Sequence, residues 1–163
     1  MNLLILDYDP VKIPKMLGDL HLKQQIDDVA TLLCSVYANG TAPRLRRQYN
    51  HPCSVWARTN RNNIEWLFSY GVELCQEHLH RFDVLPPAYG TIYWCKNHQH
   101  RLGQLLWTDN ITTFPQVIPK WLQGDDVVEA YRTYYILFKY QTVKWTKREA
   151  PVWWNNSNDY GGT

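Results

Sequence analysis

Three polar side chains recur on one side of the first strongly helical stretch, and their types suit acid–base chemistry. His21, Gln25 and Asp28 stand at positions i, i+4 and i+7 around the segment LHLKQQIDD. At about 3.6 residues per turn these positions lie together at the rim of the apolar stripe, whereas Asp27 points toward solvent. A rim carboxylate is partly desolvated, which raises its pKa and lets it accept a proton or stabilise a cationic intermediate. The alternative interpretation is an ordinary solvated polar stripe.

The elements that must position these side chains are predicted from hydrophobic spacing and stop signals. Leu22, Ile26, Val29 and Leu33 repeat at helical spacing, and Asn39-Gly40 is a stop signal. Three long helices are predicted, over residues 19–38, about 62–81 and 125–141. A short helix or turn is expected over residues 53–58. The opening LLILDYD is expected to be a short strand or extended segment, and residues 83–122 are expected to be rich in loops.

Length and composition indicate one globular domain. The chain has 163 residues, of which 45% are hydrophobic. We expect a mainly α fold: a compact single-domain bundle of about three main helices with long loops, over residues 1–163, with 155–163 as a flexible tail. No apolar run approaches the ~20 residues of a membrane span, and the N-terminus lacks the features of a secretory signal. A soluble, monomeric protein of the cytoplasm (the host cytoplasm if viral) is therefore expected.

Basic and aromatic residues cluster in two parts of the chain, although the net charge is only +2. Lysine and arginine bind phosphate, and aromatic rings stack on bases. We therefore predict DNA contacts from the first cluster and from the tail VKWTKREAPVWW, namely from Arg44, Arg46, Arg47, Arg58, Arg61, Lys144, Trp145, Lys147, Arg148 and Trp153. The alternative for the tail is that its tryptophans dock on the core while its lysines stay in water.

Histidine and cysteine provide two further candidates. His51, in Asn50-His51-Pro52, can contact phosphate or act as an acid or base, but a His-Pro step is also an ordinary helix start. Cys75-x2-His78 and Cys95-x2-His98 have zinc-like spacing. Cys75, however, falls on an apolar helix face, and both pairs lack the turns of zinc knuckles. We therefore expect no metal and no cofactor.

A resemblance to a known family covers about half of the chain. Leu17, Asp19, His21, Leu22, Asp28 and Ala38-Asn39-Gly40 resemble the catalytic helix of the pyrimidine-dimer DNA glycosylases, the bacteriophage endonuclease V type. The segment WLFSYGVELCQEHLHRF is similar to the second long helix of that family. Nearly the whole chain also resembles a group of phage proteins in four segments, which are here Asp7–Pro10, Asn50–Arg58, Ala130–Tyr135 and Trp145–Trp153.

The resemblance implies a mechanism and a set of catalytic residues. In those glycosylases the α-amino group of the first residue attacks the sugar C1′ and forms a Schiff base, while a helical glutamate stabilises the charged intermediate. An α-amine has a pKa near 8, so a sizeable neutral fraction is nucleophilic at pH 7. In this chain the implied residues are Met1, Asp28 and, as a third candidate, His21. The implied partner is double-stranded DNA with damaged or modified bases.

The chain departs from the family pattern at the predicted site. Asp28 replaces a glutamate, and Asp27 and Thr31 stand where the family has flanking arginines. The family also exposes a small residue by removing its initiator methionine, whereas bulky Asn2 predicts that Met1 stays. These differences put pyrimidine dimers in doubt as the substrate. They leave open a non-catalytic phage accessory protein that binds nucleic acid, a nucleotide or a host protein.

Overall fold

The structure is a computed structural model that describes residues 2–108, 110–139 and 143–155, and it is mainly helical as predicted. Within those residues there are seven α-helices: α1 (Ile13–Met16), α2 (Asp19–Val36), α3 (Pro52–Ala57), α4 (Arg61–Phe82), α5 (Tyr89–Asn97), α6 (Val127–Lys139) and α7 (Val152–Asn155). The expected count of about three main helices is therefore wrong. Of the tail expected at 155–163, residues 156–163 lie outside the described residues.

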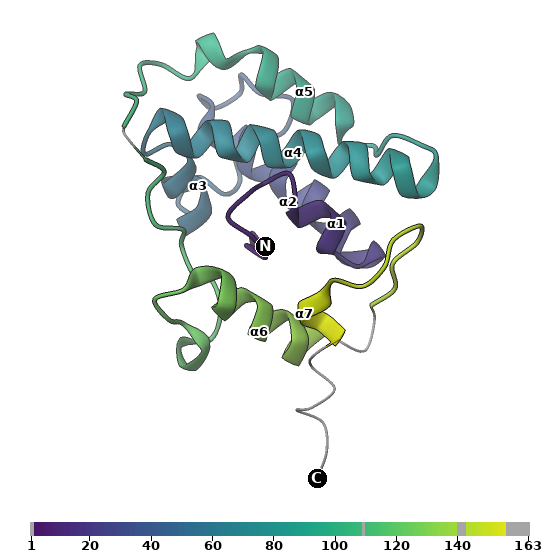
Figure 1. Ribbon diagram of the computed structural model, residues 1–163. Coiled ribbons are helices and arrows are strands. Elements are labelled where there is room, and N and C mark those ends of the chain that lie inside the picture. The colour runs from purple at the N-terminus through teal and green to yellow at the C-terminus, as the bar shows by residue number, and fades with distance from the viewer. Residues whose placement is uncertain (1, 109, 140–142, 156–163) are drawn as a thin grey trace.

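Helices α2 and α4 pack against each other, and α5 covers both, as Figure 1 shows for α4 and α5. The predicted apolar stripe of α2 is confirmed, because Leu22, Val29 and Leu33 are fully buried. The helices meet closely at Gly71. A Cβ atom at that position would lie 3.0 Å from Ile92 Cγ2 and 3.1 Å from Val29 Cγ1. The glycine therefore allows three helices to approach one point.

Helix α5 lies inside the stretch that was expected to be rich in loops. It is only 9 residues long, and just Ile92 and Cys95 of it are buried. Two buried positions do not repeat often enough to reveal a helical period, and Pro86, Pro87 and Gly90 favour a loop in the sequence. The three predicted long helices, by contrast, each have a buried face over several turns.

The first residues form an extended segment that contacts α2, α4 and α6, and Figure 1 shows it between the α2–α4 pair and α6. Its backbone groups bond to side chains. Leu4 N–H donates to Gln25 in α2 (2.9 Å), Leu6 O accepts from Arg132 in α6 (2.9 Å), and Tyr8 O accepts from Trp66 in α4 (2.8 Å). Of the two predicted forms, the extended one is confirmed.

A buried arginine near the end of α4 binds both the start of α2 and α1, which precedes it. Arg81 is 1% exposed and forms ion pairs with Asp19 (3.0 Å) and Glu77 (2.7 Å). It also donates to the backbone oxygens of Leu17 and Pro14. Burial opposes ionisation of Asp19, but hydrogen bonds from residue 146 and from Arg81 outweigh it and hold the Asp19 pKa below its ordinary value. The arginine therefore neutralises two acidic groups while it connects three segments.

Replacement of this buried cation is expected to weaken the fold far more than replacement of an exposed one. Arg81→Met leaves Asp19 and Glu77 without their shared partner and should lower the free energy of unfolding by about 3–5 kcal/mol. Lys147→Ala removes the exposed pair with Asp83 and should cost less than about 1 kcal/mol. Urea denaturation of both variants measures the difference. Equal losses would contradict the role given to Arg81.

Candidate active site beside the first peptide groups

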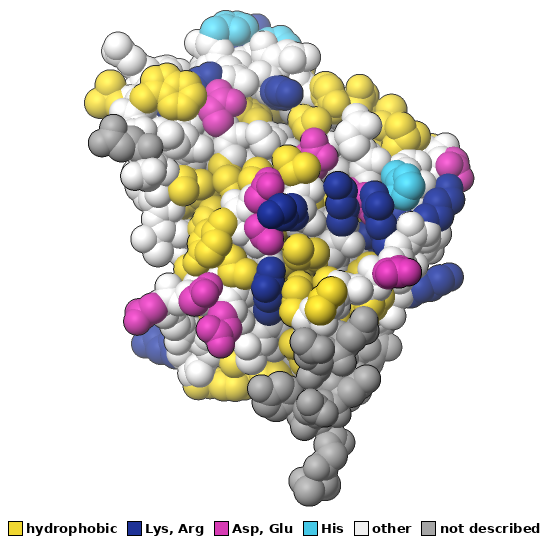
Figure 2. Space-filling model, in the orientation of Figure 1, with side chains coloured by type: hydrophobic (Ala, Val, Ile, Leu, Met, Phe, Trp, Pro, Cys, Tyr) yellow, Lys and Arg dark blue, Asp and Glu magenta, His cyan; other side chains and the backbone are white. Residues whose placement is uncertain are grey.

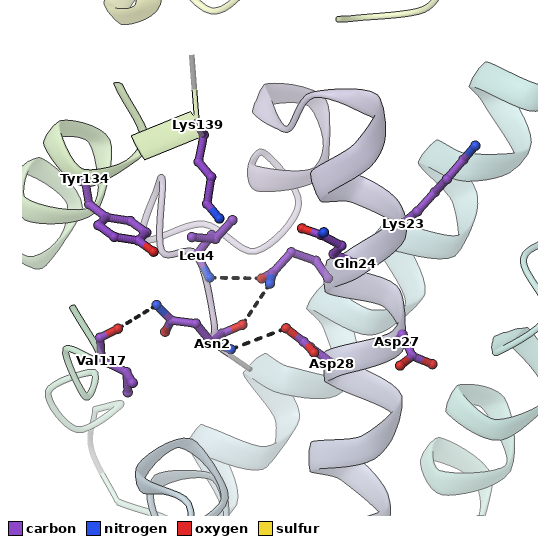
Figure 3. A pocket seen from close by; sticks show the side chains of 10 residues that line it. Asn2, Leu4, Lys23, Gln24, Asp27, Asp28, Val117, Tyr134 and Lys139 are labelled. Carbon is purple, nitrogen blue, oxygen red and sulfur yellow. Dashed lines mark hydrogen bonds between the residues drawn. The ribbon is translucent and has the colours of Figure 1, made fainter. Parts of the chain in front are cut away.

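Asp28 lies directly against the start of the chain. The backbone N–H of Asn2 donates to Asp28 Oδ2 at 3.3 Å, and Figure 3 shows Asp28 directed toward Asn2 while Asp27 points away. Asp28 is half-buried, and burial raises the pKa of its carboxyl group although the Asn2 hydrogen bond acts in the opposite direction. The predicted desolvation of this carboxylate is therefore confirmed. The solvated-stripe interpretation is wrong, because His21 and Gln25 are each 2% exposed.

Gln25, one turn before Asp28, holds the backbone of the first residues. Its Nε2 donates to Asn2 O (2.8 Å), and its Oε1 accepts from Leu4 N–H (2.9 Å) and from the Tyr70 hydroxyl (3.0 Å). All of the polar atoms of the Gln25 side chain are thus engaged. The helical spacing predicts that Gln25 lies near Asp28. It does not predict that the partner of Gln25 is the backbone of residues 2–4.

The side chain of Asn2 is held as firmly as its backbone. Asn2 Nδ2 donates to Val117 O at 2.8 Å, and Asn2 Oδ1 accepts from the Tyr131 hydroxyl at 2.9 Å. Burial raises the pKa of Tyr131, so its hydroxyl keeps its proton and remains a donor at neutral pH. Contacts from α2, from α6 and from the loop before α6 therefore converge on residue 2.

An open hollow of about 640 Å³ lies beside this contact and is called the amine hollow below. It has two lysines and two aspartates among its lining residues, which are Asn2, Leu4, Lys23, Gln24, Gln25, Asp27, Asp28, Val117, Tyr134 and Lys139. In Figure 3 Lys139 and Tyr134 extend toward the N-terminal segment, while Lys23 extends away from it. The hollow therefore combines a desolvated carboxylate with cationic and aromatic groups. None of Lys23, Tyr134 and Lys139 was predicted as a site residue.

Met1, the predicted nucleophile, lies outside the described residues. Covalent bond lengths alone keep the amino nitrogen of the residue before Asn2 within about 4 Å of the Asn2 nitrogen. The Asn2 nitrogen itself lies 3.3 Å from the Asp28 carboxylate. The predicted pairing of the chain's amino group with Asp28 stays a prediction.

His21 is fixed inside the protein and is not one of the residues that line the amine hollow. Its Nδ1 lies 2.6 Å from the hydroxyl oxygen of Tyr135, which also accepts the backbone N–H of Gly18 at 2.8 Å. Either the ring nitrogen or the hydroxyl can donate in this contact, and the tautomer of the ring decides which. Burial, helped by the charge of Lys139, lowers the His21 pKa to about 4. The contact links α2 to α6, and a catalytic role for His21 stays a prediction.

Arg44 brings a cation to the side chains that replace the family's arginines. Its guanidinium forms an ion pair with Asp27 (2.8 Å) and donates to Thr31 Oγ1 (3.1 Å). Arg44 and Arg47 also line a second hollow of about 480 Å³, which shares Asp27 with the amine hollow. Arg44, which lies in the loop after α2, therefore supplies a positive charge beside this turn of α2.

The other residues predicted to bind DNA near the N-terminal half have local partners. The guanidinium carbons of Arg46 and Arg58 lie 4.2 Å and 3.8 Å from the centroid of the Tyr49 ring. Arg61 pairs with Glu65 at 2.7 Å and lies near the exposed ring of Trp107. His51 Nδ1 accepts the N–H of Cys53 and caps α3, so the helix-start interpretation of His51 is confirmed.

Most of the predicted DNA-binding residues in the tail contact the protein itself. Arg148 binds Glu77 through two hydrogen bonds of 2.9 Å, and Lys147 pairs with Asp83 at 2.7 Å. Trp145 donates to Met16 O, and Trp153 packs edge-on against Tyr135. Lys144 contributes its backbone oxygen to Asp19 N–H at 2.7 Å. These contacts are those of a tail docked on the core, and DNA binding by these residues stays a prediction.

Charge is not gathered into one continuous positive stripe on the face shown in Figure 2, where basic and acidic side chains are interspersed. Among the described residues, no three His, Cys, Asp or Glu side chains gather in a way that would hold a metal ion. In the same part of the chain, no helix is both long enough and apolar enough to cross a bilayer. The four cysteines are buried and free; Cys34 Sγ lies 3.8 Å from Cys95 Sγ.

Comparisons of the chain with known protein families, with curated proteins and with solved structures gave no match. A proposal for function therefore depends on the geometry of this chain's own residues.

Protonation of His21 is expected to destabilise the protein in acid. The folded state lowers the His21 pKa from 6.5 to about 4, so it favours the neutral ring. This contribution to stability is complete above pH 6.5 and is lost as the pH falls from 6.5 toward 4. His21→Gln should reduce the fall in melting temperature over that range, whereas replacement of exposed His100 by Gln should not. Melting temperatures measured from pH 7 to pH 4 would refute this if both variants follow the wild type.

Removal of the Asp28 charge is expected to leave the fold as stable as before, or more stable. Burial raises the Asp28 pKa, so the folded state disfavours the ionised form and stability falls as the pH rises through that pKa. Asp28→Asn keeps an oxygen for the Asn2 N–H but carries no charge. Its melting temperature at pH 7 should equal or exceed that of the wild type. A clear decrease, measured by differential scanning calorimetry, would mean that the carboxylate is a structural group.

Proposed function

We propose that this protein is a DNA N-glycosylase, with or without AP-lyase activity, that removes a damaged or modified base by means of its N-terminal amine. One observation carries the proposal: the backbone nitrogen of Asn2 lies 3.3 Å from the half-buried Asp28 carboxylate at the edge of the amine hollow. This chemistry needs an α-amine and a desolvated carboxylate close to each other. Here the carboxylate contacts the residue that follows the amine-bearing one.

The proposed reaction uses the neutral amine of the first residue as the nucleophile. The amine nitrogen forms a bond to C1′ of the nucleotide while the bond from C1′ to the base breaks. The base leaves with the electron pair and takes up a proton. The C1′–O4′ bond then breaks, O4′ takes up the proton that the nitrogen loses, and a protonated Schiff base remains. Asp28 stabilises the positive charge that develops on the sugar and then on this nitrogen.

The contacts on Asn2 support the proposal because they fix the residue to which the amine-bearing residue is joined. Four hydrogen bonds hold Asn2, two to its backbone from Asp28 and Gln25 and two to its side chain from Val117 and Tyr131. A nucleophile held in place reacts faster, since the entropy of orientation has already been lost on folding. The four hydrogen bonds of Asn2 therefore favour reaction of the attached amine, whereas an amine on a freely moving chain end would lose more entropy on reacting.

The basic loop supports DNA as the substrate. Arg44 and Arg47 line a hollow next to the amine hollow, so both guanidinium groups lie near the place where a phosphate beside the target nucleotide would sit. Arg46 and Arg58, which both lie against the Tyr49 ring, are two further cations in this part of the sequence. Arginines positioned in this way fix the register of a nucleic acid without reading its sequence.

A non-catalytic protein that binds nucleic acid is the second candidate. The cluster of Arg46, Tyr49 and Arg58 favours it, because cationic and aromatic groups bind nucleic acid without any bond being made or broken. The Arg44 ion pair with Asp27 is compatible with both candidates. The two differ in whether the first residue and Asp28 are needed.

Borohydride trapping on duplex DNA that contains an abasic site tests the proposal. Reduction should convert the Schiff base into a stable adduct, and mass spectrometry should map the adduct to the first residue. Asp28→Asn should lower the trapping rate by about 100-fold, the size of effect seen when one stabilising group is removed. Asp125→Asn makes the same chemical change at an exposed aspartate with no role in the site and should behave as the wild type.

Two results would contradict the proposal. Absence of an adduct with the wild-type protein, under conditions in which it binds the DNA, removes the amine mechanism and leaves the second candidate. An adduct formed equally fast by Asp28→Asn removes the role given to Asp28.

A further inference from the structure

A third hollow, of about 380 Å³, lies between α2, α4 and the residues that precede α5, and is called the proline hollow below. Its lining combines apolar and cationic groups: Lys23, Ile26, Asp27, Arg44, His78, Pro86, Pro87 and Ala88. The volume lies within the range of about 300–1,000 Å³ that is usual for small-molecule sites. Asp28 and Asn2 do not line it, so it is distinct from the contact that carries the proposed function.

His78 lines the proline hollow, and one of its two ring nitrogens is bonded within the protein. The residue is 7% exposed, and its Nδ1 lies 2.7 Å from Val84 O. A carbonyl oxygen only accepts, so Nδ1 carries the proton and Nε2 of the neutral ring is an acceptor. Among the described residues, no hydrogen bond to Nε2 accompanies this contact. Nε2 is not one of the buried side-chain atoms without a partner, so it is open to solvent. A ligand that donates an N–H can therefore bind Nε2 in place of water.

The walls of the proline hollow suit a flat heteroaromatic ring. Ile26 is 3% exposed and Ala88 is 4% exposed, and Pro86 is also buried. These residues give a surface of carbon atoms on which a ring can lie. The same Val84 contact that fixes His78 also ties the loop before Pro86 to α4, so the wall is attached to the helix that carries the histidine.

Two cations at the proline hollow suit an anionic group. Lys23 Nζ lies 4.4 Å from the Phe82 ring centroid, and Figure 3 shows Lys23 extending away from the amine hollow. Arg44 is held by Asp27, whose side chain is 70% exposed. The Arg44 side chain is 30% exposed, and its bonds to Asp27 and Thr31 all come from Nη1, so Nη2 can bind a phosphate while these bonds remain. Arginine and lysine together are a common means of binding phosphate.

We propose that the proline hollow binds a nucleotide. The base lies against Ile26, Pro86 and Ala88 and donates an N–H to His78 Nε2, and the phosphate is bound by Lys23 and Arg44. The same chemistry can come from a free mononucleotide or from one unit of a single strand. The site does not depend on the reaction proposed at Asp28, since it requires neither the amine nor that carboxylate.

Calorimetric titration with three probes tests both halves of the proposed site. Adenosine 5′-monophosphate should bind at least about 10-fold more tightly than adenosine, which lacks the phosphate, and than ribose 5-phosphate, which lacks the base. His78→Phe keeps the ring but removes the acceptor and should weaken binding of the nucleotide by about 10-fold. His80→Phe makes the same change at an exposed position two residues further along α4 and should leave binding unchanged.

Nuclear magnetic resonance of the wild-type protein supplies a second measurement that does not depend on any variant. The ¹⁵N resonance of His78 Nε2 should shift when the nucleotide is added, because Nε2 gains a hydrogen bond. Titration with a short oligodeoxyadenylate identifies the source of the ligand. Tighter binding than the mononucleotide assigns the hollow to a DNA strand, and weaker binding assigns it to a free nucleotide; either result supports the site.

The proposal is overturned if ribose 5-phosphate binds as tightly as the nucleotide, or if none of the probes binds at millimolar concentration. It is also overturned if His78→Phe has a wild-type circular dichroism spectrum and unchanged affinity. All of these readouts are equilibrium binding, so a negative result here leaves the trapping experiment at Asp28 unaffected.

Discussion

An extended segment inside a helical protein has backbone donors and acceptors but no neighbouring strand to pair with. In the part of the chain that the structure describes, residues 2–8 meet this need through side chains of three helices. Gln25 is the central partner because one amide serves both Leu4 N–H and Asn2 O. A buried peptide group without a partner costs about 1–3 kcal/mol, so these bonds determine where the segment can lie.

The position of Asp28 follows from that constraint. Asp28 lies almost one turn after Gln25 on α2, so the contact that fixes Asn2 O also brings Asn2 N–H to the carboxylate. Burial raises the Asp28 pKa, so the folded state disfavours the ionised form of this carboxyl group. A cost of this kind is common where a group is retained for chemistry and not for stability. The buried Arg81 supports the arrangement from the other end, because it anchors the start of α2 through Asp19 and Leu17.

The two adjacent aspartates of α2 serve different surroundings. Asp28 turns inward to the first peptide groups, whereas Asp27 turns outward, binds Arg44 and lines all three hollows. A helix places successive residues about 100° apart, so neighbours in sequence face different partners. The amine hollow and the proline hollow therefore share Lys23 and Asp27, whereas Asp28 lines the amine hollow and not the proline hollow.

Helices with long buried faces, and the local features at their ends, can be inferred from the amino-acid sequence. The apolar spacing of α2 and α4, the outward direction of Asp27 and the cap at His51 depend on residues a few positions apart, so they could be predicted. The short α5 could not be predicted, because two buried residues set no period. Tertiary structure alone decided that Gln25 meets Asn2, that Arg44 meets Asp27, and that Arg148 binds the buried Glu77. These partners are 17 to 71 residues apart. A side chain that bonds to a distant group leaves no periodic trace in the sequence, since the match depends on how the helices pack and not on local spacing.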